Sequence, residues 1–370
     1  MSLSLYIHIP FCKRKCPYCD FYSIGYDREL AVEYVNDLSE QIKKINYRIR
    51  TVHIGGGTPT VLEPVLLRKL LDALSKILKR SRENTVEVNP ESLTREKLDL
   101  FRNYGLNRIS IGVQSINDDK LKFLGRLHDS RQALTAVQNS RKAGFRNISV
   151  DLIYGLPGES LKNWKSEIKE ISRLPVKHIS CYSLGCEPGT RFYKFKKRIS
   201  DQEVAGMYIF NMRFLPERGF FQYEVSNFSF KTFESLHNLN YWQGGDYLGL
   251  GPSAASFLKG ERLKNIADIK EYLKRIRDKK DYISYRERLN PLKRAKEFAA
   301  LSIRTKKGIN VLDFKRKTGF DFFRVQEKAQ LEKFKDKGLI KLSKKDNIIH
   351  KIFLTEKGFL FCDEVSSEFI

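Results

Sequence analysis

The 370-residue sequence has no long apolar run, no internal repeat and too few acidic residues to balance its basic ones. No stretch approaches the roughly 18 consecutive apolar residues of a membrane-spanning helix, so we expect none. The lack of repeats argues against a repeat architecture. The N-terminal residues read as a strand and not as a signal peptide, which favours a reducing cytoplasm. The length suffices for one large domain and one smaller domain.

Cysteine is scarce, with six residues, but three of them lie within the first twenty positions. Cys12, Cys16 and Cys19 have the spacing C-x3-C-x2-C. Three thiolates on one loop can hold three irons of a 4Fe–4S cluster and leave the fourth iron open to a small molecule. The alternatives are a zinc site, which normally needs four ligands, and a disulfide, which suits an oxidising compartment. We favour the cluster and treat the three scattered cysteines as ordinary thiols.

Basic residues are in large excess, with a formal net charge of +24. Positions 259–345 hold 28 Lys and Arg against 12 Asp and Glu. Such a surface can meet nucleic acid, an anionic membrane face or an acidic partner. It can also be a solvated surface without a partner, which is the interpretation we favour.

Apolar, β-branched runs alternate with helical patterns in the first half of the chain. This alternation predicts an α/β fold with a parallel sheet covered by helices. Six such units indicate a partial (β/α)6 barrel, and a Rossmann-type open sheet is the alternative. The expected strands are 5–9, 51–54, 85–88, 108–113, 148–154 and 178–184.

Unusual residues follow the carboxyl end of each predicted strand, and a barrel brings these ends to one face, where active sites are built. Gly55-Gly-Gly-Thr-Pro is no P-loop, because it lacks the trailing Gly-Lys-Ser/Thr. Its glycines would still let a ligand approach the backbone. Asp151 lies in an apolar run, where a carboxylate needs partners. Glu87, Gln114 and Arg126 could be ordinary capping or ion-pairing residues, but an arginine also suits a carboxylate ligand.

The cysteine spacing resembles the signature of radical S-adenosylmethionine (SAM) enzymes, in which SAM chelates the open iron. Together with Gly55–Thr60, Glu87–Pro90, Arg108–Ser115 and Asp151–Gly158, the run Tyr6–Tyr22 resembles the oxygen-independent coproporphyrinogen III oxidase family. The resemblance spans nearly the whole chain. It implies cluster ligands at Cys12, Cys16 and Cys19 and cofactor contacts at Tyr6, Tyr18, Gly56, Gly57, Thr58, Glu87, Gln114, Arg126 and Asp151.

Two features of the sequence indicate which branch of that family it resembles. The oxidase branch has a fourth cysteine two residues after the third, where this chain has Phe21. The run His237-Asn-Leu-Asn-Tyr-Trp242 resembles the H-N-x-x-Y-W motif of the HemW branch of haem chaperones. That resemblance implies haem binding with His237 as the candidate axial ligand. One departure is Ser253-Ala-Ala-Ser256, where family members often have Gly-Ala-His.

We predict three regions. Residues 1–225 form the radical SAM barrel with the 4Fe–4S and SAM sites, and 226–290 are a connecting region with the H-N-x-x-Y-W motif. Residues 291–370 form a smaller α+β domain that resembles a winged helix, with helices at 294–305, 311–317 and 323–337 before two strands.

The resemblance implies a haem chaperone with one 4Fe–4S cluster and SAM, whose partners are haem or porphyrin and a haem-accepting protein such as an apo-cytochrome. The first alternative is a coproporphyrinogen III oxidase, which would decarboxylate two propionates. The second is a radical SAM enzyme acting on nucleic acid, which we favour least because no RNA-binding module is recognisable. Whether SAM is cleaved stays open, and so does a peripheral membrane contact of a cytoplasmic protein.

Overall fold

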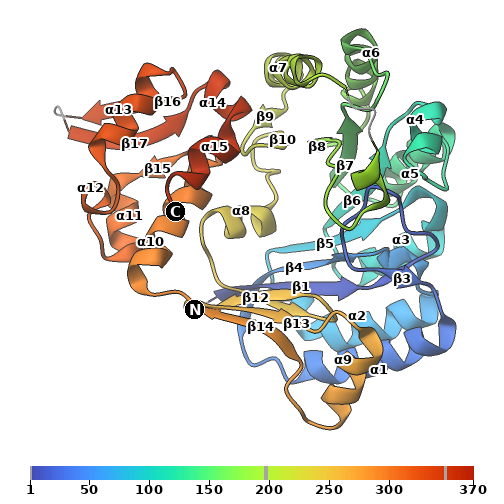
Figure 1. Cartoon of the computed structure of the whole chain (residues 1–370). Coiled ribbons are helices and arrows are strands. Elements are labelled where there is room, and N and C mark those ends of the chain that lie inside the picture. Colours follow the sequence, from blue (N-terminus) through green and yellow to red (C-terminus); the bar gives the residue numbers. More distant parts are fainter. Residues whose placement is uncertain (1, 196–198, 346–347) are drawn as a thin grey trace.

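A sheet of twelve strands forms the centre of the computed structural model, which describes residues 2–195, 199–345 and 348–370. Six neighbouring strands are parallel, follow one another in chain order, and curve into a partial barrel (Figure 1). The order has no reversal of the kind that defines a doubly wound sheet, so the barrel is confirmed and the Rossmann alternative is wrong. These strands are β1 (Ser2–Ile9), β4 (Arg48–Gly56), β5 (Glu83–Val88), β6 (Arg108–Gln114), β7 (Asn147–Tyr154) and β8 (His178–Ser183).

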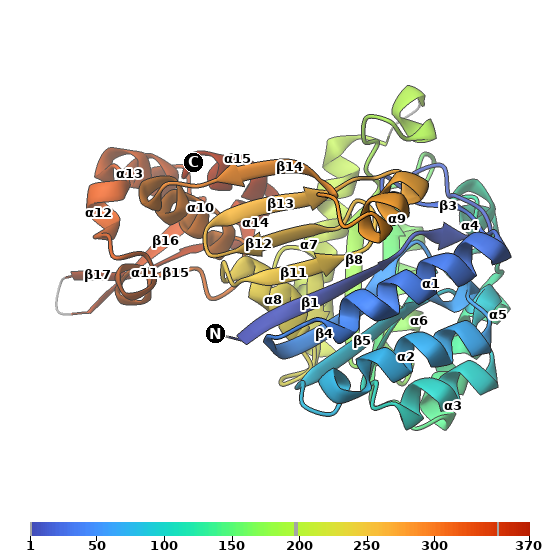
Figure 2. The same ribbon diagram turned by 90° about the horizontal axis from the view of Figure 1, so that it is seen from below.

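Helices cover the outer face of these strands (Figures 1 and 2). Asp27 and Asp129 begin two of them, each accepting a hydrogen bond from a backbone N–H of the first turn. Thr94 is the N-cap of a third helix, which follows the short 3-10 helix η2 (Pro90–Ser92). The helices are α1 (Arg28–Lys43), α2 (Pro64–Leu78), α3 (Arg95–Asn103), α4 (Asp118–Phe123), α5 (Ser130–Lys142), α6 (Leu161–Ile171) and α7 (Asp201–Glu217).

The sheet continues beyond the barrel strands at both ends. β11 (Tyr247–Leu250) pairs in parallel with β1, and three antiparallel strands extend the sheet from it (Figure 2). The region 226–290, which we predict as a connecting region, thus supplies strands to the main sheet. The other elements between α7 and the C-terminal region are β9 (Phe221–Gln222), β10 (Asn227–Ser229), α8 (Leu236–Trp242), β12 (Ala255–Leu258), β13 (Glu261–Asn265), α9 (Ile269–Arg277) and β14 (Ile283–Arg288).

The C-terminal region has its own three-stranded sheet and follows a winged-helix order of helices and strands, as predicted. The predicted helix 323–337 is wrong in one respect, because it is two helices separated at Gln326–Glu327. Its elements are α10 (Pro291–Ile303), β15 (Ile309–Asn310), α11 (Val311–Thr318), α12 (Phe322–Val325), α13 (Lys328–Asp336), β16 (Ile340–Lys345), β17 (Ile348–Leu354), α14 (Glu356–Leu360) and α15 (Cys362–Ser367).

The barrel strands are buried on both faces, as in a parallel sheet that is covered by helices, and Ser4 and His8 of β1 are buried along with its apolar residues. Leu5, Ile7 and Ile9 of β1 are fully buried, and each such side chain contributes about 1.5–3 kcal/mol. Among the described residues, no helix is both long enough and apolar enough to cross a membrane.

Candidate functional site

The three N-terminal cysteines lie on a closed loop at the carboxyl end of β1. The loop is closed because β2 (Phe11–Cys12) pairs in parallel with β3 (Ile24–Gly25), and the Tyr26 N–H donates to the Cys12 carbonyl at 3.0 Å. Cys12, Cys16 and Cys19 all line one cavity of about 420 Å³ at this end of the barrel.

Most of the predicted site residues converge on this cavity, although they come from six different strands or loops. It is lined by eleven of the thirteen, namely Cys12, Cys16, Cys19, Tyr18, Gly56, Gly57, Thr58, Glu87, Gln114, Arg126 and Asp151. Tyr6 and His237 lie elsewhere. The convergence follows from the parallel sheet, whose strands all end on the same side.

The donor set of the loop fits an iron–sulfur cluster with one open iron. Three thiols face one cavity, whereas Cys181 and Cys362 are buried in the core. In the described part of the chain the three thiols are not gathered into a closed group that could hold a metal. Burial raises the pKa of Cys12, and it raises the pKa of Cys19 to about 11. Loading iron onto these thiols would therefore release protons.

The glycine-rich loop after β4 packs directly against the cysteine loop. The Gly57 N–H donates to the Ile9 carbonyl at 2.7 Å, and the Thr58 N–H donates to the Phe11 carbonyl at 2.8 Å. A Cβ atom on Gly57 would lie 2.6 Å from the Phe11 carbonyl oxygen and 3.0 Å from Cys12 Sγ. Gly57 is therefore required for the close approach of the two loops.

Two carboxyl groups with opposite pKa shifts face the cavity. Burial would raise the pKa of Glu87, but hydrogen bonds from His53 Nε2 (2.7 Å) and the Gly56 N–H (3.2 Å) outweigh it and lower the pKa. Burial raises the pKa of Asp151, the Glu87 charge adds to this, and the hydrogen bond from Ser110 Oγ (3.0 Å) opposes it. A cationic ligand would relieve the repulsion between the two groups.

Arg126 crosses the cavity toward the cysteine loop. Its Nη2 donates to Asn89 Oδ1 at 2.7 Å and to the Gly112 carbonyl at 3.1 Å, while Nη1 lies 3.5 Å from Cys16 Sγ. Its buried Nε has no protein partner. Gln114 ends β6 with φ +64°, a strained conformation for a residue other than glycine, at a register shift between β6 and β7. The site thus combines a guanidinium, an amide and two carboxyl groups.

Asn89 is a site residue that sequence reasoning missed. Its Oδ1 accepts from Arg126, and its Nδ2 donates to Thr58 Oγ1 at 3.0 Å, so one amide links the guanidinium to the glycine-rich loop. The available signal was the alternation along the strand, because a residue two positions after Glu87 points to the same side.

His237 is buried in the barrel and is not part of the cavity. Thr51 Oγ1, which donates to Ser4 Oγ, lies 2.9 Å from His237 Nδ1, so Nδ1 carries the proton. Nε2 then accepts from the Tyr241 hydroxyl at 2.9 Å. Burial lowers the pKa of His237 well below its usual value and keeps the ring neutral. As it stands, the ring has no free lone pair for a haem iron and therefore does not fit haem ligation in this conformation.

Tyr6 lies beside this buried group, near the other barrel histidines. Its hydroxyl is 3.0 Å from His8 Nδ1, and its ring centroid is 6.0 Å from that of His53. The His53 ring packs against the His237 ring in a tilted arrangement with the centroids 5.0 Å apart, and His53 Nε2 is hydrogen-bonded to Glu87 in the cavity. Tyr6 therefore belongs to a polar network that connects the cavity with the H-N-x-x-Y-W helix α8.

Comparison with known proteins identifies similar domains and similar full-length proteins. Residues 6–171 match the radical SAM superfamily, and residues 289–361 match the HemN C-terminal domain. The chain is 35% identical to "Heme chaperone HemW" of Bacillus subtilis, with 99% of each chain covered. It is also 35% identical to the protein of that name from Lactococcus lactis, covering 99% of this chain and 97% of that one.

Among solved structures, "Coproporphyrinogen III oxidase (HemN) from Escherichia coli" superposes with a TM-score of 0.85. The match covers 100% of this chain and 90% of that one at 23% identity, so it demonstrates a shared fold only. The 35% identity to the two HemW proteins extends over the full length and demonstrates family membership: the chain belongs to the HemW family of the radical SAM superfamily.

Proposed function

We propose that this protein is a haem chaperone that carries one 4Fe–4S cluster and binds SAM beside it. The full-length similarity to proteins named heme chaperone HemW carries the proposal. Its partners would be haem and a haem-accepting protein such as an apo-cytochrome, and a thiol-bound cluster suits a reducing cytoplasm.

In this proposal Cys12, Cys16 and Cys19 hold the cluster. Such a cluster, when bound with SAM, supplies the electron for radical chemistry. Backbone atoms of Gly56 and Gly57 offer a ligand close approach to the loop.

The polar groups of the cavity are suited to the remaining parts of SAM. Glu87 and Asp151 favour a positively charged ligand, and Arg126 suits a carboxylate. The Glu87 side chain is 39% exposed, which leaves it accessible from the cavity. Thr58 and Gln114 add a hydroxyl and an amide at the cavity wall.

Haem ligation by His237 requires a change of conformation, because Tyr241 occupies Nε2 and the ring is buried. We propose that His237 becomes available when α8 loosens. Trp242 lies on the same helix and is covered by Arg304, whose guanidinium is 5.1 Å from the indole ring. Uncovering of His237 would therefore also disturb the contact between α8 and α10.

The test is anaerobic reconstitution followed by a haem titration and a coproporphyrinogen assay on the same sample. We expect a haem Soret shift, transfer of haem to an apo-cytochrome and no decarboxylation of coproporphyrinogen III, since Phe21 stands where the oxidases have their fourth cysteine. Formation of protoporphyrinogen without haem binding would contradict the proposal and favour the oxidase.

A further inference from the structure

A second cavity, of about 650 Å³, lies on the other side of the cysteine loop. It is bounded by this loop, by α4 and by the 3-10 helix η3 (Arg191–Lys194). The Phe192 N–H donates to the Pro17 carbonyl at 3.0 Å, which ties η3 to the cysteine loop. Its volume is in the usual range of about 300–1,000 Å³ for small-molecule sites.

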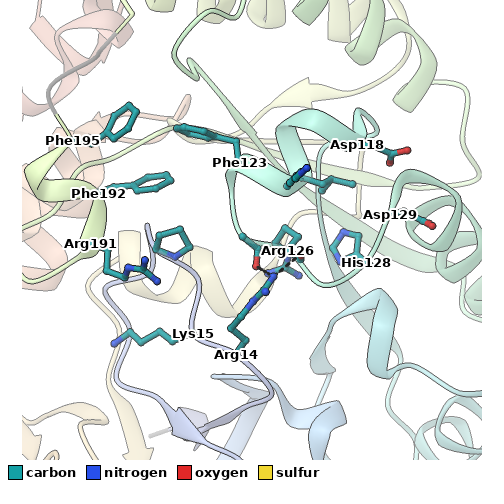
Figure 3. Close-up of a pocket in the computed structure, with 14 residues that line it drawn as sticks. Arg14, Lys15, Asp118, Phe123, Arg126, His128, Asp129, Arg191, Phe192 and Phe195 are labelled. Carbon is teal, nitrogen blue, oxygen red and sulfur yellow. Dashed lines mark hydrogen bonds between the residues drawn. The ribbon is translucent and has the colours of Figure 1, made fainter.

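Three phenylalanine rings form one wall of this second cavity (Figure 3). The ring of Phe123 lies 5.0 Å from that of Phe192 and 5.6 Å from that of Phe195, and the last two are 5.7 Å apart. Phe192 is buried, whereas Phe123 and Phe195 are only partly covered. Partly exposed rings at such spacings offer an apolar, aromatic face for a flat ligand.

Cationic side chains lie next to the aromatic wall. Figure 3 shows Arg191, Lys15 and Arg14 gathered below the rings. Arg14 donates to the carbonyls of Gly125 (2.7 Å) and Arg126 (3.0 Å), which holds its guanidinium at the cavity.

The carboxylates of the same cavity, Asp118 and Asp129, lie on its opposite side (Figure 3). Both are occupied by backbone donors, because Asp118 accepts from the Ser130 N–H and Asp129 from the Gln132 N–H, each at 2.7 Å. Because both carboxylates lie across the cavity from Arg14, Lys15 and Arg191, the positive charge beside the rings remains available to an anionic ligand.

Among the described residues of this second cavity, the imidazole of His128 is not available to ligate iron, because both of its ring nitrogens have protein partners. His128 is buried, and its ring nitrogens lie 3.0 Å from the Val113 carbonyl and 3.3 Å from the Glu91 carboxylate. An aromatic wall with cations at its edge matches a planar macrocycle that carries two carboxylates. We propose that this cavity is a docking site for the tetrapyrrole, which recognises the ring and the propionates independently of the metal. The inference rests on the proposed haem-chaperone function.

The experiment compares haem with iron-free protoporphyrin IX and its dimethyl ester on the reconstituted protein, by Soret absorbance and porphyrin fluorescence. Protoporphyrin IX should bind, and the ester should bind at least about tenfold more weakly because its propionates are uncharged. Arg191→Glu and Phe195→Ala should each weaken protoporphyrin binding by about tenfold. Arg80→Glu, the same change on an exposed arginine after α2, is the control and should leave it unchanged.

His237→Ala separates this site from the motif on α8, because it should weaken binding of haem but not of protoporphyrin IX. If haem binds while protoporphyrin IX does not, or if Arg191→Glu and Phe195→Ala bind like wild type, the docking site is wrong and the proposed function stands. If the wild type binds neither tetrapyrrole, the proposed function itself fails.

Discussion

Gly57 and Gly25 belong to the two segments that hold the cysteine loop, and they differ in what a side chain would meet. A Cβ on Gly57 would clash with the Phe11 carbonyl and Cys12 Sγ, whereas nothing lies within 4 Å of a Cβ on Gly25. We predict that Gly57→Val displaces the loop and loses most of the roughly four irons per chain that one 4Fe–4S cluster provides. Gly25→Ala should keep them. Iron and sulfide analysis after reconstitution tests this prediction. Full iron loading of Gly57→Val would show that the cluster does not depend on the close approach of the glycine-rich loop to the cysteine loop.

Tyr241 competes with any metal for the lone pair of His237. Tyr241→Phe removes the hydroxyl that donates to Nε2, at a cost of about 1 kcal/mol in stability. If His237 is the haem ligand, we expect Tyr241→Phe to bind haem several-fold more tightly and His237→Ala to bind it more weakly, as measured by Soret titration. Equal haem affinity in the wild type and both variants would rule out ligation by His237.

The residue types of the cavity could be predicted from the sequence, but the burial of His237 could not. Eleven predicted residues share the cavity because they lie near strand ends or in the segments that follow them, which is a local feature of the chain. The partners of His237 are remote, since Thr51 is 186 positions away and Glu83 binds its backbone N–H from 154 positions away. No motif spacing reports contacts of that range.

At the scale of elements, the short helix α8 is held at its N-terminus by Glu83 of β5. The buried carboxylate accepts from the Leu236 N–H at 3.0 Å and from the His237 N–H at 2.9 Å. Glu83→Ala leaves two buried donors without a partner, which costs about 1–3 kcal/mol. We expect faster hydrogen–deuterium exchange over residues 236–242. Asp27→Ala, which removes the N-cap of α1, is the control and should leave α8 unchanged. Unchanged protection of α8 in Glu83→Ala would contradict the proposed loosening.

The barrel strands were predictable, whereas the extension of the sheet was not. β1 and β4 to β8 are apolar because helices bury them, and this pattern is visible in the chain. β13 and β14 read Glu-Arg-Leu-Lys-Asn and Ile-Ser-Tyr-Arg-Glu-Arg, with many exposed or half-exposed side chains. Such polar edge strands resemble a solvated basic surface until their partners are known.

At the scale of the whole molecule, Glu224 lies where the barrel meets the C-terminal domain. It forms a β-bridge with Thr305, and the Lys306 N–H donates to the Tyr223 carbonyl at 3.0 Å. Burial raises the pKa of Glu224 to about 7, although hydrogen bonds from Asn227 and Ser226 oppose this.

This raised pKa predicts a pH-dependent stability. Between about pH 4.5 and 7 the folded chain keeps a proton that the unfolded chain has released, so the free energy of unfolding falls as the pH rises. Glu224→Gln removes this loss and should be more stable than wild type at pH 8 by about 2–3 kcal/mol, but not at pH 4.5. Urea unfolding at both pH values tests this, and an identical pH dependence of the two proteins would contradict it.

The central claim is that one cavity at the mouth of the barrel holds both the cluster and SAM. The most direct measurement is the EPR spectrum of the reduced, reconstituted protein with and without SAM. We predict a 4Fe–4S signal that requires Cys12, Cys16 and Cys19, changes when SAM is added, and responds less to SAM in Asp151→Ala. A spectrum that saturating SAM leaves unchanged, or a cluster that survives loss of any of the three cysteines, would contradict the claim.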